Sequence, residues 1–103
     1  MRITVISKAP PGGRCTLYLG YARTLAACFR AEVEVLHPAP QADLQPPAML
    51  VDGQPISPAD GVLLSPEDIH RGIAKIGLLM TDHPDLLERL EALDAEFMNE
   101  CEA

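Results

Sequence analysis

Cysteine is the residue type in this sequence whose chemistry is easiest to place. Cys15 follows Gly12, Gly13 and Arg14, where a loop passes into an expected helix. A helix N-terminus and a neighbouring arginine lower the pKa of a thiol, and the thiolate is the form that attacks disulfides. We therefore take Cys15 as the candidate catalytic residue and Gly12, Gly13 and Arg14 as candidate binding residues. The alternative is that Cys15 is a small side chain in the first helical turn with no chemical role.

The other two cysteines, Cys28 and Cys101, are expected to pack without reacting. Cys28 lies three residues after Leu25 on the apolar stripe of the same helix, where a free cysteine behaves as a small hydrophobe. Cys101 falls in the last turns of the final helix, where it is expected to pack weakly. An odd number of widely spaced cysteines, with no signal-peptide pattern at the start, does not fit a secreted disulfide scaffold. We therefore expect a protein of the reducing cytoplasm.

Composition and charge exclude several classes of function. The chain has 103 residues, enough for one domain, with a net charge of −7 and only 4% aromatic residues. Such a surface repels phosphates and lacks stacking platforms for bases, so no nucleic-acid binding is expected. The longest apolar stretches are too short to cross a membrane. His37, His70 and His83 lie in different elements without ligand-like spacing, so neither a metal site nor a cofactor is expected.

The spacing of apolar residues and the placement of turn residues predict strands and helices along the whole chain. The expected elements are a strand (2–7), a helix (14–30), a strand (31–37), a proline-rich loop (37–46), a strand (48–51), a return strand ending at Leu64, a helix capped by Ser65 and a last helix (83–101). The dipeptide Asp52-Gly53 marks the hairpin turn between the third strand and the return strand.

The strand over 31–37 is expected at an edge of the sheet, beside the first strand. Its residues alternate between the acids Glu32 and Glu34 and the valines Val33 and Val35. We expect the valines to face the core and the acids to face water, an arrangement that also discourages edge-to-edge aggregation.

Three features of the first 80 residues support a resemblance to a known family. The first strand leads into a loop and a helix that begins near Cys15, and Pro47 stands directly before a strand. The segment Pro-Pro-Ala-Met-Leu-Val-Asp-Gly-Gln-Pro-Ile is followed by Leu-Ser-Pro-Glu-Asp-Ile. In these features residues 1–80 resemble the minimal thioredoxin fold, and they are most similar to small redox-active-disulfide and glutaredoxin-like proteins.

The resemblance implies both a fold and a site. The fold is α/β, a minimal thioredoxin-like β-α-β-β-β-α unit over residues 1–80 with a mixed four-stranded sheet, followed by an additional helix in 81–103. In that family a cis-proline faces the cysteine and shapes the substrate groove. The resemblance therefore implies that Pro47 is cis and close to Cys15, and it adds Pro46 and Pro47 to the candidate binding residues.

The family's Cys-x-x-Cys motif is degenerate here. The corresponding residues are Gly12-Gly13-Arg14-Cys15, so Gly12 stands where the nucleophile is expected. In the other register Cys15 comes first, and Tyr18 takes the place of the second cysteine. One thiol is missing either way, which predicts a non-catalytic binding or assembly module for an unknown protein partner. The alternative is a monothiol thiol–disulfide oxidoreductase or glutathione-dependent reductase that uses Cys15.

The helix expected in 81–103 carries apolar residues along one side. They are Leu86, Leu90, Leu93 and Phe97. The strand over 48–51 is apolar on both faces, and the loop over 37–46 is too short to supply a covering helix. We expect the C-terminal helix to fold back over the open face of the sheet, or to cover that face in a second copy and form a homodimer.

Overall fold

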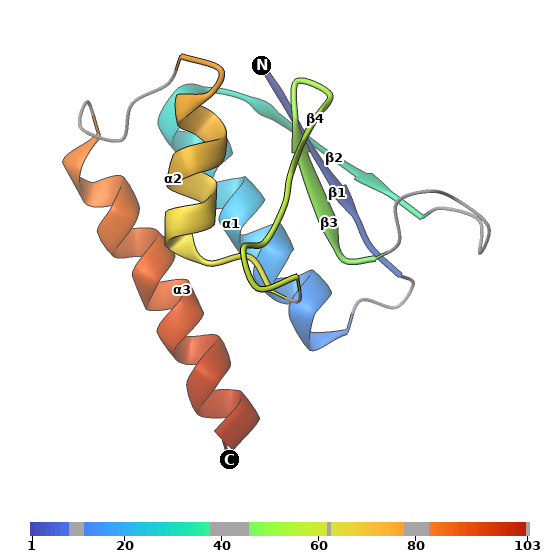
Figure 1. Ribbon diagram of the computed structural model, residues 1–103, viewed down its shortest axis with the longest axis vertical. Helices are drawn as coiled ribbons and strands as arrows, with labels where there is room; N and C mark the ends of the chain where they lie inside the picture. The colour runs from blue at the N-terminus through green and yellow to red at the C-terminus, as the bar shows by residue number, and fades with distance from the viewer. Residues whose placement is uncertain (9–11, 38–45, 62, 78–82, 103) are drawn as a thin grey trace.

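A computed structural model describes residues 1–8, 12–37, 46–61, 63–77 and 83–102, with the backbone alone at 100–102. Within these ranges the chain forms a mixed four-stranded sheet and three helices, in agreement with the predicted α/β class (Figure 1). The elements are β1 (Arg2–Ile6), α1 (Gly13–Phe29), β2 (Glu32–Leu36), β3 (Ala48–Val51), β4 (Gln54–Ile56), α2 (Pro66–Ala74) and α3 (Pro84–Glu102). Most of the predicted proline-rich loop and the side chain of Cys101 lie outside the described residues.

The four strands follow the order β2-β1-β3-β4. β1 is parallel to β2, as expected for strands joined through a helix, and antiparallel to β3. β3 and β4 form an antiparallel hairpin whose turn is Asp52-Gly53. The φ angles of these two residues are 50° and 82°, the positive values that a two-residue type I′ turn needs. The hairpin predicted from Asp-Gly is therefore confirmed.

The return strand is shorter than predicted, because β4 ends at Ile56 instead of continuing to Leu64. Pro58 has no N–H to give to a strand ladder. Its carbonyl accepts a hydrogen bond of 3.1 Å from the N–H of Gly61, whose φ of 75° suits a turn. Leu64 lies beyond this turn and is buried in the core instead of pairing with a strand.

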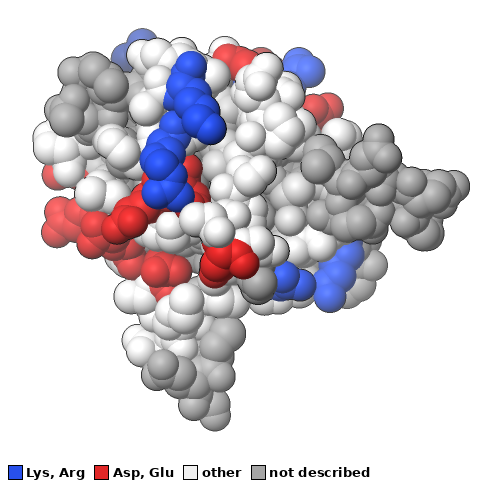
Figure 2. All heavy atoms as spheres, in the orientation of Figure 1, with Lys and Arg blue, Asp and Glu red and all other residues white. Residues whose placement is uncertain are grey.

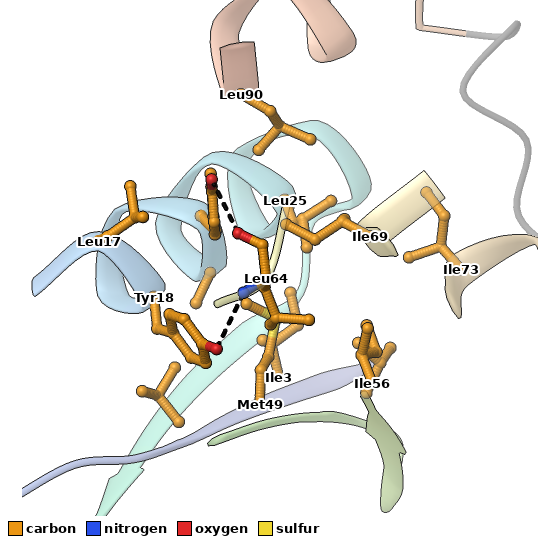
Figure 3. Close-up of a cluster of buried hydrophobic side chains, with 14 of the residues drawn as sticks. Ile3, Leu17, Tyr18, Leu25, Met49, Ile56, Leu64, Ile69, Ile73 and Leu90 are labelled. Atoms are coloured by element: carbon orange, nitrogen blue, oxygen red, sulfur yellow. Dashed lines mark hydrogen bonds between the residues drawn. The ribbon is translucent and has the colours of Figure 1, made fainter. Parts of the chain in front are cut away.

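Two tyrosines of α1 hold the backbone of Leu64 (Figure 3). The N–H of Leu64 donates to the hydroxyl oxygen of Tyr18 at 3.0 Å, and the hydroxyl of Tyr21 donates to the carbonyl of Leu64 at 3.3 Å. Burial raises the pKa of both tyrosines, so these hydroxyls keep their protons at neutral pH. The segment between β4 and α2 is thereby fixed to α1.

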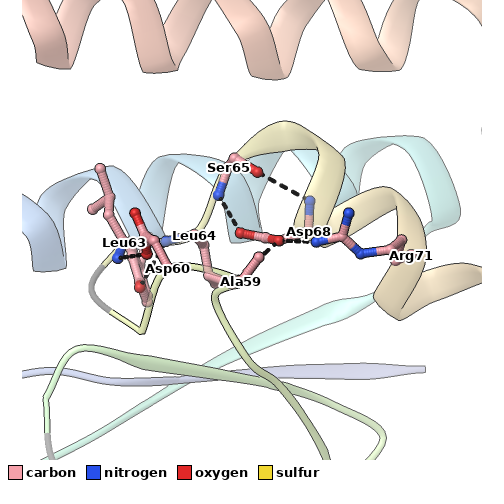
Figure 4. Close-up of polar contacts among 8 residues, drawn as sticks. Ala59, Asp60, Leu63, Leu64, Ser65, Asp68 and Arg71 are labelled. Atoms are coloured by element: carbon pink, nitrogen blue, oxygen red, sulfur yellow. Dashed lines mark hydrogen bonds and ion pairs between the residues drawn. The ribbon is translucent and has the colours of Figure 1, made fainter.

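The start of α2 fixes the same segment from its other end (Figure 4). The predicted cap is confirmed, since the Ser65 hydroxyl accepts from the N–H of Asp68 at 3.1 Å. The buried carboxylate of Asp68 accepts from the N–H groups of Ser65 and Ala59, at 3.0 and 3.3 Å, and pairs with Arg71. One acid therefore holds both the helix start and the loop before it.

The C-terminal helix packs where it was not expected. α1 and α2 cover one face of the sheet, and α3 lies against α1 and α2 on their side away from the strands (Figure 1). Leu86 and Leu90 of α3 are completely buried, and Leu93 and Phe97 are partly buried against the same core. The prediction that this helix covers the open face of the sheet is wrong. Because its leucines are buried within one chain, a second copy is not needed to cover them.

The position of α3 is explained by α1, which is apolar on two sides instead of having the single apolar stripe that was expected. Tyr18 and Leu25 are buried on α1 in the core cluster that also contains the sheet residues. On the side facing α3, a Cβ atom at Gly20 would lie 3.4 Å from Leu93, and one at Gly13 would lie 3.4 Å from Phe97. Both distances correspond to ordinary van der Waals contact, so α3 packs directly on the outer side of α1 and buries its apolar side on a helix instead of on strands.

β2 occupies the sheet edge beside β1, as predicted, but its side chains differ from expectation. Val33 and Val35 pair with Ile3 and Val5 and so share their face of the sheet, yet they are 37% and 41% exposed. The helix layer lies over the inner strands and leaves these edge valines half covered. Glu34, expected in water, is half-buried and accepts a hydrogen bond of 3.3 Å from the hydroxyl of Thr4.

Candidate functional site

The predicted cysteine site lies at the N-terminus of α1. Gly12 is the N-cap residue and Cys15 is the third residue of the helix. The carbonyl of Gly12 accepts from the N–H of Thr16 at 2.9 Å and from its hydroxyl at 3.0 Å. No side chain caps this helix, so the backbone at Gly12 and the first turn is where an anionic group is favoured.

All six predicted site residues line one small pocket, of about 80 Å³, together with one residue that sequence analysis did not single out. They are Lys8, Gly12, Gly13, Arg14, Cys15, Pro46 and Pro47. The peptide bond between Pro46 and Pro47 is cis, and Pro47 shares this pocket with Cys15, so both parts of that prediction are confirmed. The chain thus brings together segments that lie more than thirty residues apart in sequence.

Cys15 is covered, and its acidity is nevertheless increased. Its side chain belongs to the buried set, with 2% of the residue exposed. Burial by itself raises the pKa of the thiol. Hydrogen bonds with the backbone of Lys8 and Gly12 and with the Ser7 side chain lower the pKa, as does the charge of Lys8, and together they outweigh burial. The net result is a pKa below the ordinary cysteine value. The Cys15 thiol therefore ionises more readily than an ordinary cysteine but has little access to solvent.

A second, larger cavity of about 290 Å³ adjoins the first and shares Arg14, Pro46 and Pro47 with it. Its remaining lining comes from α1, β3, β4 and the segment after β4: Tyr18, Ala48, Met49, Pro55, Ile56, Ser57, Pro58 and Gly61. Sequence analysis missed the contribution of this segment. Its turn residues gave a local signal for a bend, but only the contacts of Leu64 and Asp68 place it beside the site.

Lys8 and Ser7 are the neighbours of Cys15 that sequence analysis overlooked. Both follow directly after β1, and the Ser7 hydroxyl donates to the carbonyl of Lys8 at 2.9 Å. A Cβ atom at Gly12 would meet the Cε of Lys8 at 2.8 Å, which shows how closely this cation approaches the helix start. The sequence did contain a signal for Lys8. Lys8 follows the end of β1, and the chain runs from there to the start of α1 at Gly13, so Lys8 could be expected near the helix N-terminus.

The remaining cysteines do not complete a dithiol within the part of the chain that is described. Cys28 is half-buried and lies thirteen residues along α1 from Cys15, which corresponds to about 20 Å at 1.5 Å per residue. A disulfide needs Cα atoms no more than about 7 Å apart. Within the same described residues, no group of three His, Cys, Asp or Glu side chains is arranged to hold a metal ion.

A further cavity, of about 410 Å³, lies between β4 and α2 and contains none of the predicted site residues. It is lined in part by Arg71 and Lys75, and Figure 2 shows the row of basic side chains over α2 on this face. Because Arg71 is paired with the buried carboxylate of Asp68, much of its charge is already neutralised. This cavity has weaker grounds for a chemical role than the pocket at Cys15.

No described helix is both long and apolar enough to cross a membrane. Comparison of the chain with protein-family models, with curated proteins and with solved structures found no match. The interpretation of the site therefore depends on its own geometry and on the resemblance carried by the sequence.

Proposed function

We propose that the protein is a thioredoxin-like binding module of the reducing cytoplasm that has lost dithiol chemistry and binds a protein partner. The strand order β2-β1-β3-β4 and the placement of α1 and α2 on one face support the thioredoxin-like assignment. So does the pocket that Pro47 shares with Cys15. The two adjoining cavities at this end of the sheet offer a concave surface on which a partner segment can lie.

One observation carries the non-catalytic part of the proposal. Gly12 stands at the N-cap of α1, the place of the nucleophile in the resembled family, and it has no side chain to react. Cys15, three residues later, is 2% exposed. A nucleophilic thiol must reach its substrate, so a covered thiol behind a glycine fits a structural role better than catalysis.

The lowered pKa of Cys15 favours a second candidate function. A thiol that ionises more readily than usual suits a monothiol oxidoreductase or a glutathione-dependent reductase. In that reaction the Cys15 thiolate attacks one sulfur of a substrate disulfide, the other sulfur leaves as a thiolate, and glutathione then releases Cys15 by a second exchange. The chemistry requires the pocket to open, because the thiol is covered.

Alkylation of Cys15 across a pH series separates the two functions. In a Cys28→Ser/Cys101→Ser protein, iodoacetamide reports only Cys15. Because its folded-state pKa is lowered, we expect the alkylation rate to rise with a midpoint below the ordinary cysteine value. Because the thiol is covered, the plateau rate should be about tenfold or more below that of the same protein in denaturant, which corresponds to an opening cost of about 1.4 kcal/mol. A plateau equal to that of the unfolded chain supports the reductase instead.

A further inference from the structure

The exposed edge of β2 has a defined pattern of backbone groups. The N–H of Glu32 donates to the carbonyl of Met1 at 3.1 Å, and the carbonyl of Leu36 accepts from the N–H of Ser7 at 2.9 Å. In a parallel pair, alternate residues of a strand direct both backbone groups to the same neighbour. Glu32, Glu34 and Leu36 therefore bond towards β1, and the N–H and C=O groups of Val33 and Val35 point away from the sheet.

β2 is the last strand in the sheet order, so no strand among the described residues pairs with this outer edge (Figure 1). The valine side chains, 37% and 41% exposed, lie on the face that carries the helices. Glu32 and Glu34 lie on the opposite face, and the side chain of Glu32 is 81% exposed. On that face the carboxylate of Glu32 lies 3.7 Å from the guanidinium of Arg2, and Glu34 accepts from the hydroxyl of Thr4. An added strand would therefore meet apolar groups on one face and two carboxylates on the other, the first of them shared with Arg2.

We propose that the β2 edge binds an extended segment of a partner protein in which apolar and basic residues alternate. The segment would pair with β2 as a fifth strand, through hydrogen bonds to the outward N–H and C=O groups of Val33 and Val35. Its apolar residues would cover these valines, and its lysines or arginines would lie beside Glu32 and Glu34. The inference goes beyond the proposed function, because the outer edge of β2 is a different surface from the two cavities at Cys15.

Charge selects this occupant over a second copy of the chain. In an antiparallel pairing of β2 with itself, the register with the fullest overlap places Glu34 opposite Glu34. A shift that pairs Val33 with Val33 places Glu32 opposite Glu34. Shifting the other way pairs Val35 with Val35 without opposing acids, but it keeps only residues 34–36 paired and leaves Val33 outside the pairing. Self-association therefore either opposes like charges or gives up two of the five residues of β2. A basic segment instead gains from both acids and from the net charge of −7, which speeds its approach.

The probe is a synthetic peptide with blocked ends in which valine and lysine alternate, added to the full chain at low ionic strength. We expect binding that slows hydrogen exchange at the amides of Val33 and Val35, which exchange rapidly in the free protein. Amides of Glu32, Glu34 and Leu36 are protected from the start by β1. A matched peptide with N-methyl groups on the edge that faces β2 cannot pair, so it should lose the binding. Equal binding of the N-methylated peptide, or unchanged exchange at the two valines, would overturn the proposal.

Charge reversal tests the specificity. Glu32→Lys/Glu34→Lys should weaken binding of the valine–lysine peptide about tenfold or more, because two attractive pairs become repulsive. It should also create affinity for a peptide in which valine and glutamate alternate. The matched control is Glu88→Lys/Glu91→Lys, which changes the net charge equally through two exposed acids of α3 and should retain most of the binding. Equal losses in the two variants would show non-specific attraction and refute the strand pairing.

Two further measurements complete the test. If the double variant loses structure, the charge-reversal test can be repeated with Glu32→Lys alone, because the side chain of Glu32 is 81% exposed. A dimer of the wild-type chain whose interface protects Val33 and Val35 would overturn the charge argument. The strand addition and the cysteine chemistry lie on different surfaces. Turnover that depends on Cys15 would therefore refute the proposed function without removing the strand addition, and a failed strand addition would leave the cysteine result intact.

Discussion

Replacing Leu90 with alanine is expected to lower the free energy of unfolding by about 2–5 kcal/mol. Leu90 is completely buried and points from α3 into the core between α1 and α2 (Figure 3). Its loss removes buried apolar surface and leaves a cavity that the packed helices cannot close fully. For a domain whose total stability is about 5–15 kcal/mol, the change moves the midpoint of a urea melt strongly.

Leu87 provides the control on the same helix. It is 37% exposed, so Leu87→Ala removes the same atoms from a site that water already reaches. We expect a change within about 0.5 kcal/mol. Equal losses at the two leucines would mean that α3 is not packed against α1 and α2 as described, and that the helix has another place on the molecule.

Gly12→Cys is expected to install the dithiol that the sequence lacks. The φ of Gly12 is −80°, which a residue with a side chain adopts freely, so the backbone accepts the change. The new Cβ would meet only the far end of the Lys8 side chain, at 2.8 Å from Cε and 3.1 Å from Nζ, and that end can move aside. The new thiol, at the N-cap of α1, would stand three residues before Cys15 in a Cys-x-x-Cys arrangement.

After mild oxidation, we expect neither of these two thiols in the Gly12→Cys protein to react with a thiol-titrating reagent, because they form a disulfide. We also expect this protein to reduce the disulfides of insulin with dithiothreitol as electron donor. Gly12→Ser and Gly12→Cys/Cys15→Ser are the controls, since neither contains the pair. If the Gly12→Cys protein keeps both thiols under oxidation, residues 12 and 15 are not placed as in the resembled family, and the thioredoxin-like assignment fails.

Local signals in the sequence were sufficient for the hairpin turn, the start of α2 and the edge strand, but not for the end of β4. The Asp52-Gly53 turn, the Ser65 cap and the strand beside β1 each depend on a few neighbouring residues, and the structure contains them. The destination of α3 could not be predicted in the same way. It depends on whether the outer side of α1 or the open face of the sheet gives the closer fit, and that comparison involves surfaces formed by residues far apart in sequence.

The candidate site shows the same division. The residues around Cys15 were found because they are adjacent in sequence, and Pro47 was found through the resemblance. The contribution of Lys8 to the acidity of Cys15 and the small exposed fraction of the thiol were not predictable, because both depend on how the end of β1 meets the start of α1. Acidity and access act in opposite directions on reactivity, so the sequence left both functions open.

The most direct measurement is glutathione-dependent reduction of a small mixed disulfide by the wild-type protein, compared with Cys15→Ser. A binding module without redox chemistry should show no turnover above the uncatalysed rate, and the two proteins should be indistinguishable. Turnover by the wild-type protein that disappears in Cys15→Ser would contradict the proposed function and establish Cys15 as the nucleophile of a monothiol reductase.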